Sequence, residues 1–323
     1  MKLQRRRFLH LAAGAGALSA VSRIARAQAY PSRPVRLIVG FAAGGAPDIV
    51  ARLLGQWLSA RLGAPFIIEN RSGAGGSVAT EAVAHAPPDG HALLFVTSAN
   101  TINMTLDGSL NFIRDIVPVA SISREPIVMA VNPSFPATTV PEFISHAKSN
   151  PGRLSMGSPG TGTSPHMAGE LFKFMTGIDL VHVPYRGSPP ALIDLIGGRL
   201  QVMFSPLPPS IEYIRTGKLR ALAVTTAARS GALPDIPTVG DFVPGYEASA
   251  FYGIGAPAGT SADIIDRLNQ EINAALADRE LRAQLVDLGS AVLVGSPADF
   301  SKLVVEETEK WAKVVKLSGA KPD

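Results

Sequence analysis

The residues of this sequence that could do chemistry gather in glycine-rich turns, of which the first is Phe41-Ala42-Ala43-Gly44-Gly45-Ala46-Pro47-Asp48. It follows a short apolar run and opens a segment with helical spacing. Glycine permits positive φ and the close approach of a ligand to the backbone. A helix start adds free N–H groups and the positive end of the helix dipole. The turn either holds a carboxylate or phosphate without a charged side chain, or is only a tight strand-to-helix connection.

Asp48 is an unusual neighbour for an anion, because its carboxylate is itself negative. In the first turn of a helix an aspartate interacts favourably with the dipole whatever else it does. In a binding site it could hold the turn in shape or position a water. Pro47, just before it, suits the first helical turn.

The second turn is Ser158-Pro159-Gly160-Thr161-Gly162-Thr163-Ser164-Pro165-His166, again after an apolar run and before a helix. Thr163 or Ser164 is a candidate N-cap. Capping explains a hydroxyl before a helix, but it does not explain the glycines and proline just upstream. His166 either ligates an anion or is a structural histidine at a helix start.

A third turn, Asn70-Arg71-Ser72-Gly73-Ala74-Gly75-Gly76-Ser77, lies between a strand and its helix. Arg71 is either an anion ligand or a solvated loop arginine. All three turns follow strands, and ligands of doubly wound domains bind at the carboxyl ends of strands. We expect the first and second turns to face one cleft between two domains.

Several enzyme and cofactor signatures are missing. The serines near glycines do not fit G-x-S-x-G, the glycines around Gly253 do not fit a dinucleotide fingerprint, and neither a Walker A sequence nor H-E-x-x-H is present. With no cysteine, a thiolate metal site, a cysteine nucleophile and an Fe–S cluster are excluded. We therefore expect no catalytic residue, no cofactor and no metal, although a catalytic group assembled from distant residues stays open.

The elements that position these turns alternate between strand and helix. Strands are predicted at 35–39, 66–68, 93–96, 154–156, 180–183, 202–204 and 219–225, and helices at 47–62, 78–84, 165–176, 190–196 and 211–215. This alternation predicts an α/β fold with two doubly wound domains built on parallel sheets. Long amphipathic helices at 262–278 and 297–317 surround one short strand at 291–294. We expect this last quarter to complete the first domain, which makes a hinge of two strands that cross near 127–131 and 250–254.

The domains are therefore predicted as residues 30–126 plus 251–323 and residues 127–250, after a signal peptide at 1–29. The leader has a basic start, a 14-residue weakly apolar segment and Ala27-Gln28-Ala29 as a cleavage site. Its Arg5-Arg6-Arg7-Phe8-Leu9 fits a twin-arginine signal, or a general secretory signal with extra arginines. The leader holds six basic and no acidic residues, so 24 basic and 26 acidic residues remain, a net charge of −2. We expect an exported, periplasmic protein that binds no nucleic acid.

Seven motifs in fixed order resemble one family. The first three are the turn that begins at Phe41, the segment Glu69–Gly76 and the turn that begins at Ser158. The other four are Val183-Pro184-Tyr185-Arg186-Gly187, Gly217-Lys218-Leu219-Arg220, Pro234-Asp235-Ile236-Pro237-Thr238-Val239 and Ala256-Pro257-Ala258-Gly259-Thr260. From about Pro31 to its end the chain is similar to the Bug family, the TctC-like solute-binding receptors of tripartite tricarboxylate transporters. The resemblance implies a hinged, type II periplasmic binding protein, acting as a monomer, that holds a ligand carboxylate through backbone amides and waters.

The ligand-binding residues predicted from the turns and the resemblance are Phe41, Ala42, Ala43, Gly44, Gly45, Asp48, Ser98, Ser158, Gly162, Thr163, His166, Tyr185 and Ser205. Two positions depart from the family pattern. Many relatives have an acidic residue where this chain has Ser205, and they often have tryptophan at Phe251. Because Ser205 supplies no charge for a ligand ammonium, an organic, dicarboxylic or aromatic acid is expected rather than an amino acid.

The sequence thus predicts a receptor that captures a small carboxylate and delivers it to integral membrane transporter subunits. A periplasmic α/β hydrolase with His166 as base is the alternative from another class. A ligand-sensing receptor without a role in transport is a further alternative.

Overall fold

The computed structural model describes residues 30–108 and 111–321. The signal peptide predicted over residues 1–29, with its cleavage site, lies outside the described residues. The chain from Arg33 onward forms one compact unit. Among its described helices, none is both long enough and apolar enough to cross a bilayer.

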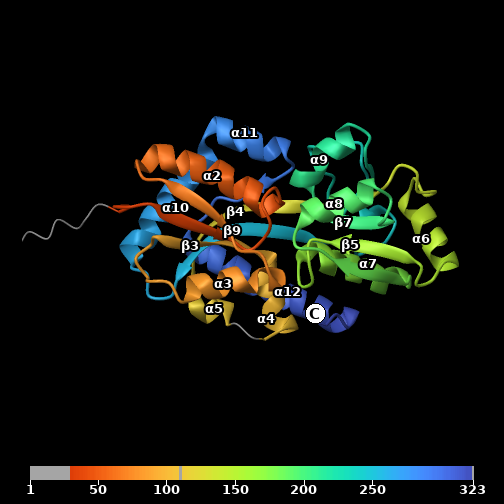
Figure 1. The fold of residues 1–323 in the computed structure, drawn as a ribbon, viewed down its shortest axis with the longest axis horizontal. Helices are drawn as coiled ribbons and strands as arrows, with labels where there is room; N and C mark the ends of the chain where they lie inside the picture. Colours follow the sequence, from red (N-terminus) through yellow and green to blue (C-terminus); the bar gives the residue numbers. More distant parts are fainter. Residues whose placement is uncertain (1–29, 109–110, 322–323) are drawn as a thin grey trace, which may run out of the picture. The chain divides into compact units, whose positions relative to one another are not determined.

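Ten strands form one mixed sheet (Figure 1). They are β1 (Val35–Val39), β2 (Phe66–Asn70), β3 (Ala92–Thr97), β4 (Ile116–Val131), β5 (Leu154–Ser158), β6 (Leu180–Pro184), β7 (Val202–Pro206), β8 (Arg220–Val224), β9 (Ser249–Pro257) and β10 (Ala291–Val292). The order across the sheet is β2-β1-β3-β9-β4-β7-β5-β6, with β8 and β10 also paired to β4.

Helices connect and cover these strands. They are α2 (Ala46–Leu62), α3 (Ser77–Ala84), α4 (Ser98–Leu106), α5 (Phe112–Asp115), α6 (Val140–Ser149), α7 (Ser164–Thr176), α8 (Ser188–Ile196), α9 (Leu207–Arg215), α10 (Ala262–Ala277), α11 (Arg279–Asp287) and α12 (Pro297–Ser318), with 3₁₀ turns at Ala74–Gly76 and Val239–Asp241. Figure 1 shows α2, α10 and α11 on one side of the first strands and α3, α4 and α12 on the other.

Strand β4 belongs to two regions of the sheet. From Ile116 to Pro126 it pairs with β9, and from Ile127 onward it pairs with β7 and β8. We call β1, β2, β3, β9, β10 and the first part of β4 the first sheet region, and β5, β6, β7, β8 and the last part of β4 the second. Strand β9 pairs with β3 and β4 along its length, so the return crossing precedes Ser249 rather than falling at 250–254 as predicted.

The expectation of parallel pairing is correct for only part of the sheet. β1, β2 and β3 are mutually parallel, as are β5, β6 and β7. Every ladder made by β4 is antiparallel, as is that between β3 and β9. A long strand that runs from one sheet region into the next, and is met by a returning strand, forms antiparallel pairs that a βαβ pattern does not reveal.

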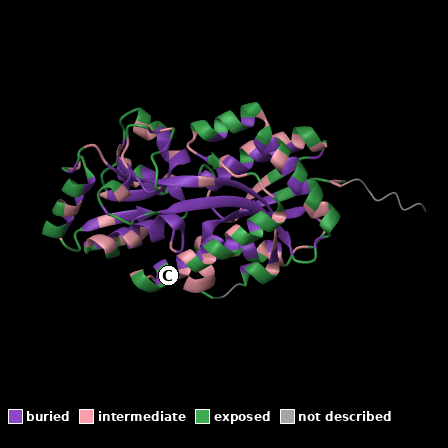
Figure 2. Ribbon diagram, turned by 180° about the vertical axis from the view of Figure 1, so that it is seen from behind, coloured by how far each residue is buried: buried purple, intermediate pink, exposed green. Residues whose placement is uncertain are grey.

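The central strands are buried on both faces, whereas the edge strands β2 and β6 and the outer faces of the helices keep exposed residues (Figure 2). Strands β3, β7 and β9 have no exposed or half-buried residue. Such strands give continuous apolar runs instead of alternation, as expected for a sheet covered by helices on both sides. The fold is therefore α/β, as the sequence predicted.

The last helix, α12, joins two hydrophobic clusters. Phe300 and Val304 near its start pack with Ile38, Leu94 and Phe251 of the first sheet region. Trp311, Val314 and Val315 near its end share a cluster with Met156, Phe172 and Phe204, which belong to the second region or its helix α7. The predicted domain limits assign all of 251–323 to the first domain, but the end of α12 packs against the other side.

Candidate functional site

A cavity lies where five helices begin, each directly after a strand. α2 follows β1 after one short turn, α4 follows β3, α7 follows β5, α8 follows β6 and α9 follows β7. The space free of atoms in this cavity is about 380 Å³, open solvent included. We call it the inner cavity; its lining residues are Phe41, Gly45, Pro47, Thr97, Ala99, Pro159, Thr163, Ser164, Pro165, Gly187, Ser188, Pro206 and Tyr252.

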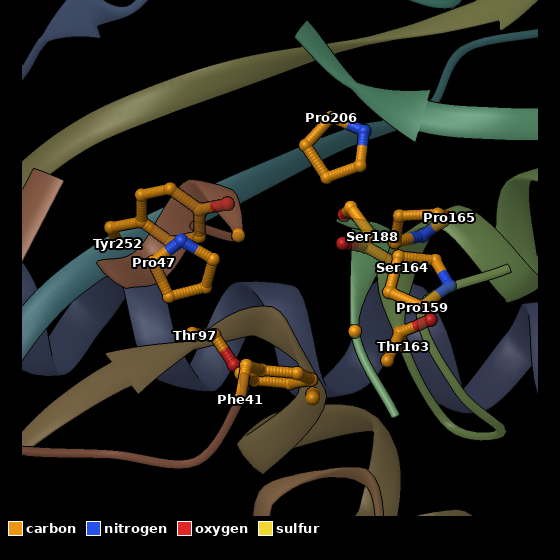
Figure 3. A pocket seen from close by; sticks show the side chains of 13 residues that line it. Phe41, Pro47, Thr97, Pro159, Thr163, Ser164, Pro165, Ser188, Pro206 and Tyr252 are labelled. Atoms are coloured by element: carbon orange, nitrogen blue, oxygen red, sulfur yellow. The ribbon is translucent and has the colours of Figure 1, made fainter. Parts of the chain in front are cut away.

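The two sheet regions contribute opposite walls of the inner cavity. Figure 3 shows Phe41, Pro47, Thr97 and Tyr252 on one side. Facing them are the side chains of the second region and its helix starts: Pro159, Thr163, Ser164, Pro165, Ser188 and Pro206. The first and second glycine-rich turns of the sequence therefore do face one cavity.

The first turn is held in shape by Asp48. The Gly44 N–H donates to Asp48 Oδ2 at 2.9 Å, and the side chains of Arg52 and Asn70 donate to the same carboxylate, each at 2.9 Å. Gly44 has φ of +78°, which glycine adopts without strain. Burial by itself would raise the pKa of Asp48, but the hydrogen bonds from Arg52, Gly44 and Asn70 outweigh it, so the pKa lies below its ordinary value. Of the two roles considered for Asp48, the contacts support holding the turn.

The second turn is held by Ser158, Thr163 and His166. Thr163 caps α7: its Oγ1 accepts from the His166 N–H at 3.3 Å and donates to the Gly160 carbonyl at 2.7 Å. Ser158 Oγ accepts from the Gly160 N–H at 3.2 Å and lies 2.7 Å from His182 Nε2. The Gly162 N–H donates to His166 Nδ1 at 3.2 Å. These bonds fix the backbone of residues 158–163 beside the cavity.

His166 is a neutral, buried part of this turn. Burial, with the nearby His182 and Lys173, lowers the pKa of His166 to about 3. Its ring stacks on that of His182 at 3.9 Å between centroids. An imidazole that is neutral and accepts from a backbone N–H carries no positive charge for an anion. His166 is not among the residues that line the cavity.

Three hydroxyl groups on largely buried residues are accessible from the inner cavity and have no protein partner. Tyr252, Ser164 and Ser188 are 2%, 5% and 2% exposed. Within residues 30–108 and 111–321, the hydroxyls of these three side chains make no hydrogen bond. Burial raises the pKa of Tyr252 well above its ordinary value, so this hydroxyl keeps its proton and can donate. Because these hydroxyls face the cavity without a protein partner, each is available to bind a ligand or water.

No charged side chain lines the inner cavity. Its polarity comes from hydroxyls and from the first turns of five helices, whose dipoles place partial positive charge there. In the part of the chain that the structure describes, the N–H groups of Ala46, Ser164 and Ser188, the first residues of α2, α7 and α8, donate to no protein acceptor. Helix starts with free N–H groups bind anionic groups. The arrangement suits a small acid with an apolar body, because prolines and Phe41 supply the rest of the wall.

The structure places the predicted site residues differently with respect to the cavities. Phe41, Gly45 and Thr163 line the inner cavity, and Tyr185 lines a neighbouring cavity together with Phe41. Asp48, Ser158, Gly162 and His166 fix the two turns from behind, while Ala42 and Gly44 lie against Gly187 and Pro189 of the opposite side. Ala43 is exposed.

Ser98 and Ser205 are fully buried behind the wall. Ser98 Oγ accepts from the Phe251 N–H at 2.8 Å, and Ser205 Oγ lies 2.7 Å from Ser210 Oγ. The residues beside them, Thr97, Ala99 and Pro206, line the cavity instead. Whether any predicted residue contacts a ligand stays a prediction.

Sequence reasoning missed Tyr252, Ser188 and Pro206. The signal for Ser188 was present, since Gly187-Ser188-Pro189-Pro190 opens a helix after a strand, as the first two turns do. Tyr252 lies in the middle of an apolar strand, and nothing local distinguishes it from a core tyrosine. In the described residues, no group of three or more His, Cys, Asp or Glu side chains is placed to hold a metal ion.

The fold is that of the periplasmic binding proteins. The model of the family described as "Tripartite tricarboxylate transporter family receptor" (TctC) matches residues 50–319, and the chain belongs to this family. Members of this family are solute-binding receptors rather than enzymes, which confirms the prediction of a binding protein.

Three relatives place the chain within the family. Protein BugT of Bordetella pertussis is 34% identical over 91% of this chain and 92% of its own. An R. palustris protein solved with adipate is 37% identical, with a TM-score of 0.88 over 91% of this chain and 100% of that one. MatC from Rhodopseudomonas palustris with bound malate is 32% identical, with a TM-score of 0.84 over 88% and 100% of the two chains.

Proposed function

We propose that this protein binds a small carboxylate in the inner cavity and delivers it to membrane transporter subunits. The observation that carries the proposal is the set of three unpartnered hydroxyls, on the largely buried residues Tyr252, Ser164 and Ser188, that face a cavity without charged side chains. An ionised carboxylate only accepts hydrogen bonds, with about four acceptor sites on its two oxygens. Hydroxyl donors and helix N–H groups match that need.

Other ligand classes fit this cavity less well. A ligand ammonium would need a carboxylate or several carbonyl acceptors, and no acidic side chain lines the cavity. The positive ends of the five helix dipoles would also oppose a cation. The adipate and malate bound to the two R. palustris relatives are carboxylates, which supports the same class here.

The proposed mechanism of capture is closure of two lobes over the ligand. The lobes are those predicted, residues 30–126 with 251–323 and residues 127–250, except that Ser249 and Ala250 belong with the first lobe and the end of α12 extends onto the second. β4 is the continuous connection, because its pairing changes between Pro126 and Ile127. Residues of opposite walls lie close: a Cβ placed on Gly187 would be 3.1 Å from that of Ala42, and one on Gly75 would be 2.6 Å from the Thr161 carbonyl oxygen. Opening would separate these loops and admit the ligand.

The proposal also includes export of the protein and a membrane transporter as its partner. We place the mature receptor in the periplasm, after cleavage of the leader near Ala29, acting as a monomer that presents its ligand to transporter subunits. The leader motif and the family support export, and the family's description supports a transporter partner. A sensing role without transport would use the same cavity.

The hydrolase alternative has one contact in its favour, the 2.7 Å pairing of Ser158 Oγ with His182 Nε2. Such a pair resembles a nucleophile with its base. Ser158 is fully buried, however, and lines neither the inner cavity nor the one beside it. A substrate in either cavity does not reach this hydroxyl, so the pair holds the turn.

The test is binding by ligand-free protein. Protein unfolded, dialysed and refolded is screened by thermal shift against small mono- and dicarboxylates, and the untreated protein is analysed by native mass spectrometry for a retained acid. A ligand at 100 times its dissociation constant stabilises the fold by roughly 2.7 kcal/mol, which gives a clear rise in melting temperature. Tyr252→Phe and Ser188→Ala should weaken this rise, whereas Tyr213→Phe, which changes a tyrosine outside the cavity, should not. If no acid raises the melting temperature while ester or amide substrates are turned over, the receptor function is wrong.

A further inference from the structure

A buried carboxylic acid lies in β4, the strand that runs through both sheet regions. Glu125 is 0% exposed and directly precedes Pro126, after which β4 changes its pairing. Its Oε1 accepts from the Ser123 hydroxyl at 2.6 Å, and its Oε2 accepts from the Ser290 hydroxyl at 2.8 Å. Two neutral donors only partly replace the water that an ionised carboxylate loses on burial. Burial therefore raises the pKa of Glu125 to about 7, so both of its charge states are populated near neutral pH.

No basic side chain neutralises Glu125 in the part of the chain that the structure describes. The pKa of this carboxyl is shifted by burial and by the two serine hydroxyls, and no charged group contributes. The charged groups of the neighbouring elements are paired with one another: Asp48 with Arg52 in α2, Glu271 of α10 with Arg61 and Arg267, Arg215 of α9 with Asp287 of α11, and Arg124 of β4 with Glu307 of α12. A second negative charge brought near Glu125 therefore acts on a carboxylate that no cation stabilises.

Glu125 and the cavity-lining Tyr252 lie on the same face of the sheet. In the antiparallel ladder of β4 and β9, Ser123 is opposite Tyr252 and Glu125 is opposite Ala250. Opposite residues share a face, as do residues two apart on one strand, so Tyr252 is the diagonal neighbour of Glu125, roughly 7–8 Å away. Burial is the larger cause of the raised pKa of Tyr252, and the negative charge of Glu125 adds to it. Tyr252 is thus the titratable group that faces Glu125, and it also lines the inner cavity (Figure 3).

We propose that Glu125 takes up a proton when the inner cavity captures its carboxylate, so that ligand binding and proton binding are coupled. The proton comes from solvent, bonds to an oxygen of the ionised Glu125 carboxylate and returns to solvent when the ligand leaves. The coupling arises because the ligand and Glu125 bring two negative charges into one region from which water is largely excluded. This inference rests on the proposed function and adds a regulation of the same site: the receptor holds its ligand more tightly at lower pH.

The expected size of the coupling follows from electrostatics. Two like charges roughly 10 Å apart, at an effective dielectric constant of about 20, shift each other's pKa by about one unit. Affinity for a carboxylate should therefore be highest near pH 6, fall roughly tenfold as the pH rises through about 7 to about 8, and level off above that. By reciprocity, the bound ligand strengthens proton binding by the same factor.

Calorimetry on ligand-free protein tests the coupling. Adipate, or the mono- or dicarboxylate that most raises the melting temperature, is titrated at about pH 7.5 in PIPES, HEPES and Tris, whose ionisation enthalpies differ. The change of the observed enthalpy with that of the buffer gives the number of protons taken up. Simple carboxylic acids are ionised at this pH, so the proton goes to the protein. The variants are Glu125→Gln, Ser290→Ala and, as the control, Glu271→Gln, which changes another buried glutamate outside the cavity wall. Circular dichroism checks that each variant folds.

Wild-type protein should take up about half a proton under these conditions. Glu125→Gln should take up none, and its affinity should stay constant between about pH 6 and about pH 9, roughly tenfold above that of wild type at the alkaline end. Ser290→Ala removes a hydrogen bond that stabilises the ionised carboxylate, so its fall in affinity should move to higher pH. Glu271→Gln should behave as wild type does.

Binding by wild-type protein without proton uptake, and with equal affinity at the two ends of this pH range, would overturn the coupling and leave the receptor function standing. Because this measurement needs no variant, it decides whether or not Glu125→Gln folds. Uptake that persists in Glu125→Gln would also overturn the coupling, since the proton would then bind another group, such as His182. Failure of every acid to bind wild-type protein would overturn the proposed function and this inference with it.

Discussion

The guanidinium of Arg124 in β4 lies 2.8 Å from the carboxylate of Glu307 in α12. Arg124 Nη1 also donates to Ser249 Oγ, the first residue of β9, at 3.0 Å. Glu307 Oε2 accepts from the Trp311 indole N–H at 2.9 Å. The pair thus ties β4, which runs through both sheet regions, and the start of β9 to the helix that packs in both hydrophobic clusters. It lies beside the positions where the lobes are proposed to move.

Glu307→Gln should destabilise the fold. Glu307 is 4% exposed, so the change leaves the Arg124 guanidinium without its ionic partner in a partly buried place. We expect a loss of about 1–3 kcal/mol in the free energy of unfolding, measured by urea denaturation. Glu306→Gln is the matched control, because the Glu306 side chain is 61% exposed and pairs only loosely with Lys302. Equal stability of the two variants would contradict a structural role for the Arg124–Glu307 pair.

Asp48→Asn should damage the first turn and with it ligand binding. The carboxylate accepts hydrogen bonds from Gly44, Arg52 and Asn70, and an amide cannot accept all three. Stability should fall by about 1–3 kcal/mol, and affinity for a carboxylate should fall as well. Asp266→Asn on the exposed face of α10 is the control.

The pH dependence of the unfolding free energy is a second test of the role of Asp48. Because its folded pKa is below the ordinary 3.8, its contribution to stability is present above that pH and is lost as the pH falls through the folded pKa. The difference in unfolding free energy between wild type and Asp48→Asn should therefore shrink on acidification. A difference that stays constant down to acid pH would show that the charge of Asp48 is not what holds the turn.

Ionisation of the buried Glu125 carboxyl should lower the free energy of unfolding as the pH rises. Burial raises the pKa of Glu125 from 4.5 to about 7, partly offset by hydrogen bonds from Ser123 and Ser290 at 2.6 and 2.8 Å. A folded pKa above the unfolded one favours the folded state below pH 4.5, and this advantage is lost as the pH rises through about 7. Once the pH exceeds the folded pKa, this pKa shift corresponds to a loss of roughly 3 kcal/mol in the free energy of unfolding.

Glu125→Gln removes that titration while keeping the shape of the side chain. Melting temperatures of the variant and wild type are compared from acid to mildly alkaline pH. The variant should gain on wild type as the pH rises from about 4.5 to about 7 and keep a constant lead above that, and the two should converge at acid pH. Parallel curves across the whole range would show that Glu125 does not titrate in this window.

Valine at Gly44 or Gly45 should reduce binding more than alanine at Arg71. Gly44 has φ of +78°, which valine disfavours, and a Cβ on Gly45 would lie 3.2 Å from the Ala42 carbonyl oxygen. Arg71 pairs with Glu69 and lines neither cavity. Calorimetry with a carboxylate ranks the three variants, with folding checked by circular dichroism. Normal binding by both valine variants, together with complete loss in Arg71→Ala, would make the site a side-chain ion pair.

The sequence predicted the regular βαβ parts of this fold well. β1, the helix after it, and the strands and helices from Leu154 to Arg215 lie within a few residues of their predicted limits, because periodicity and proline or glycine punctuation define them locally. The two turns that form the cavity were also identified, since glycines before a proline-containing helix start are a local signal.

What the sequence did not reveal depends on long-range pairing. The antiparallel ladders of β4 and β9 join residues more than a hundred positions apart, such as Arg124 and Phe251. Ser98 and Ser205 were predicted at the site, but the structure buries them one residue away from the wall, where alternation along the backbone decides which neighbour faces the cavity. Tyr252 reaches the cavity only because β9 pairs beside β3.

The measurement that tests the central claim most directly is a titration followed by amide NMR. Ligand-free, ¹⁵N-labelled protein is titrated with the carboxylate that most raises its melting temperature, with succinate and adipate tried first. The account predicts that the backbone amides of Ala46, Ser164 and Ser188, which begin α2, α7 and α8, shift progressively and saturate together. Saturable shifts confined to arginine and lysine side chains, with these three amides unchanged, would contradict the claim that helix starts hold the carboxylate.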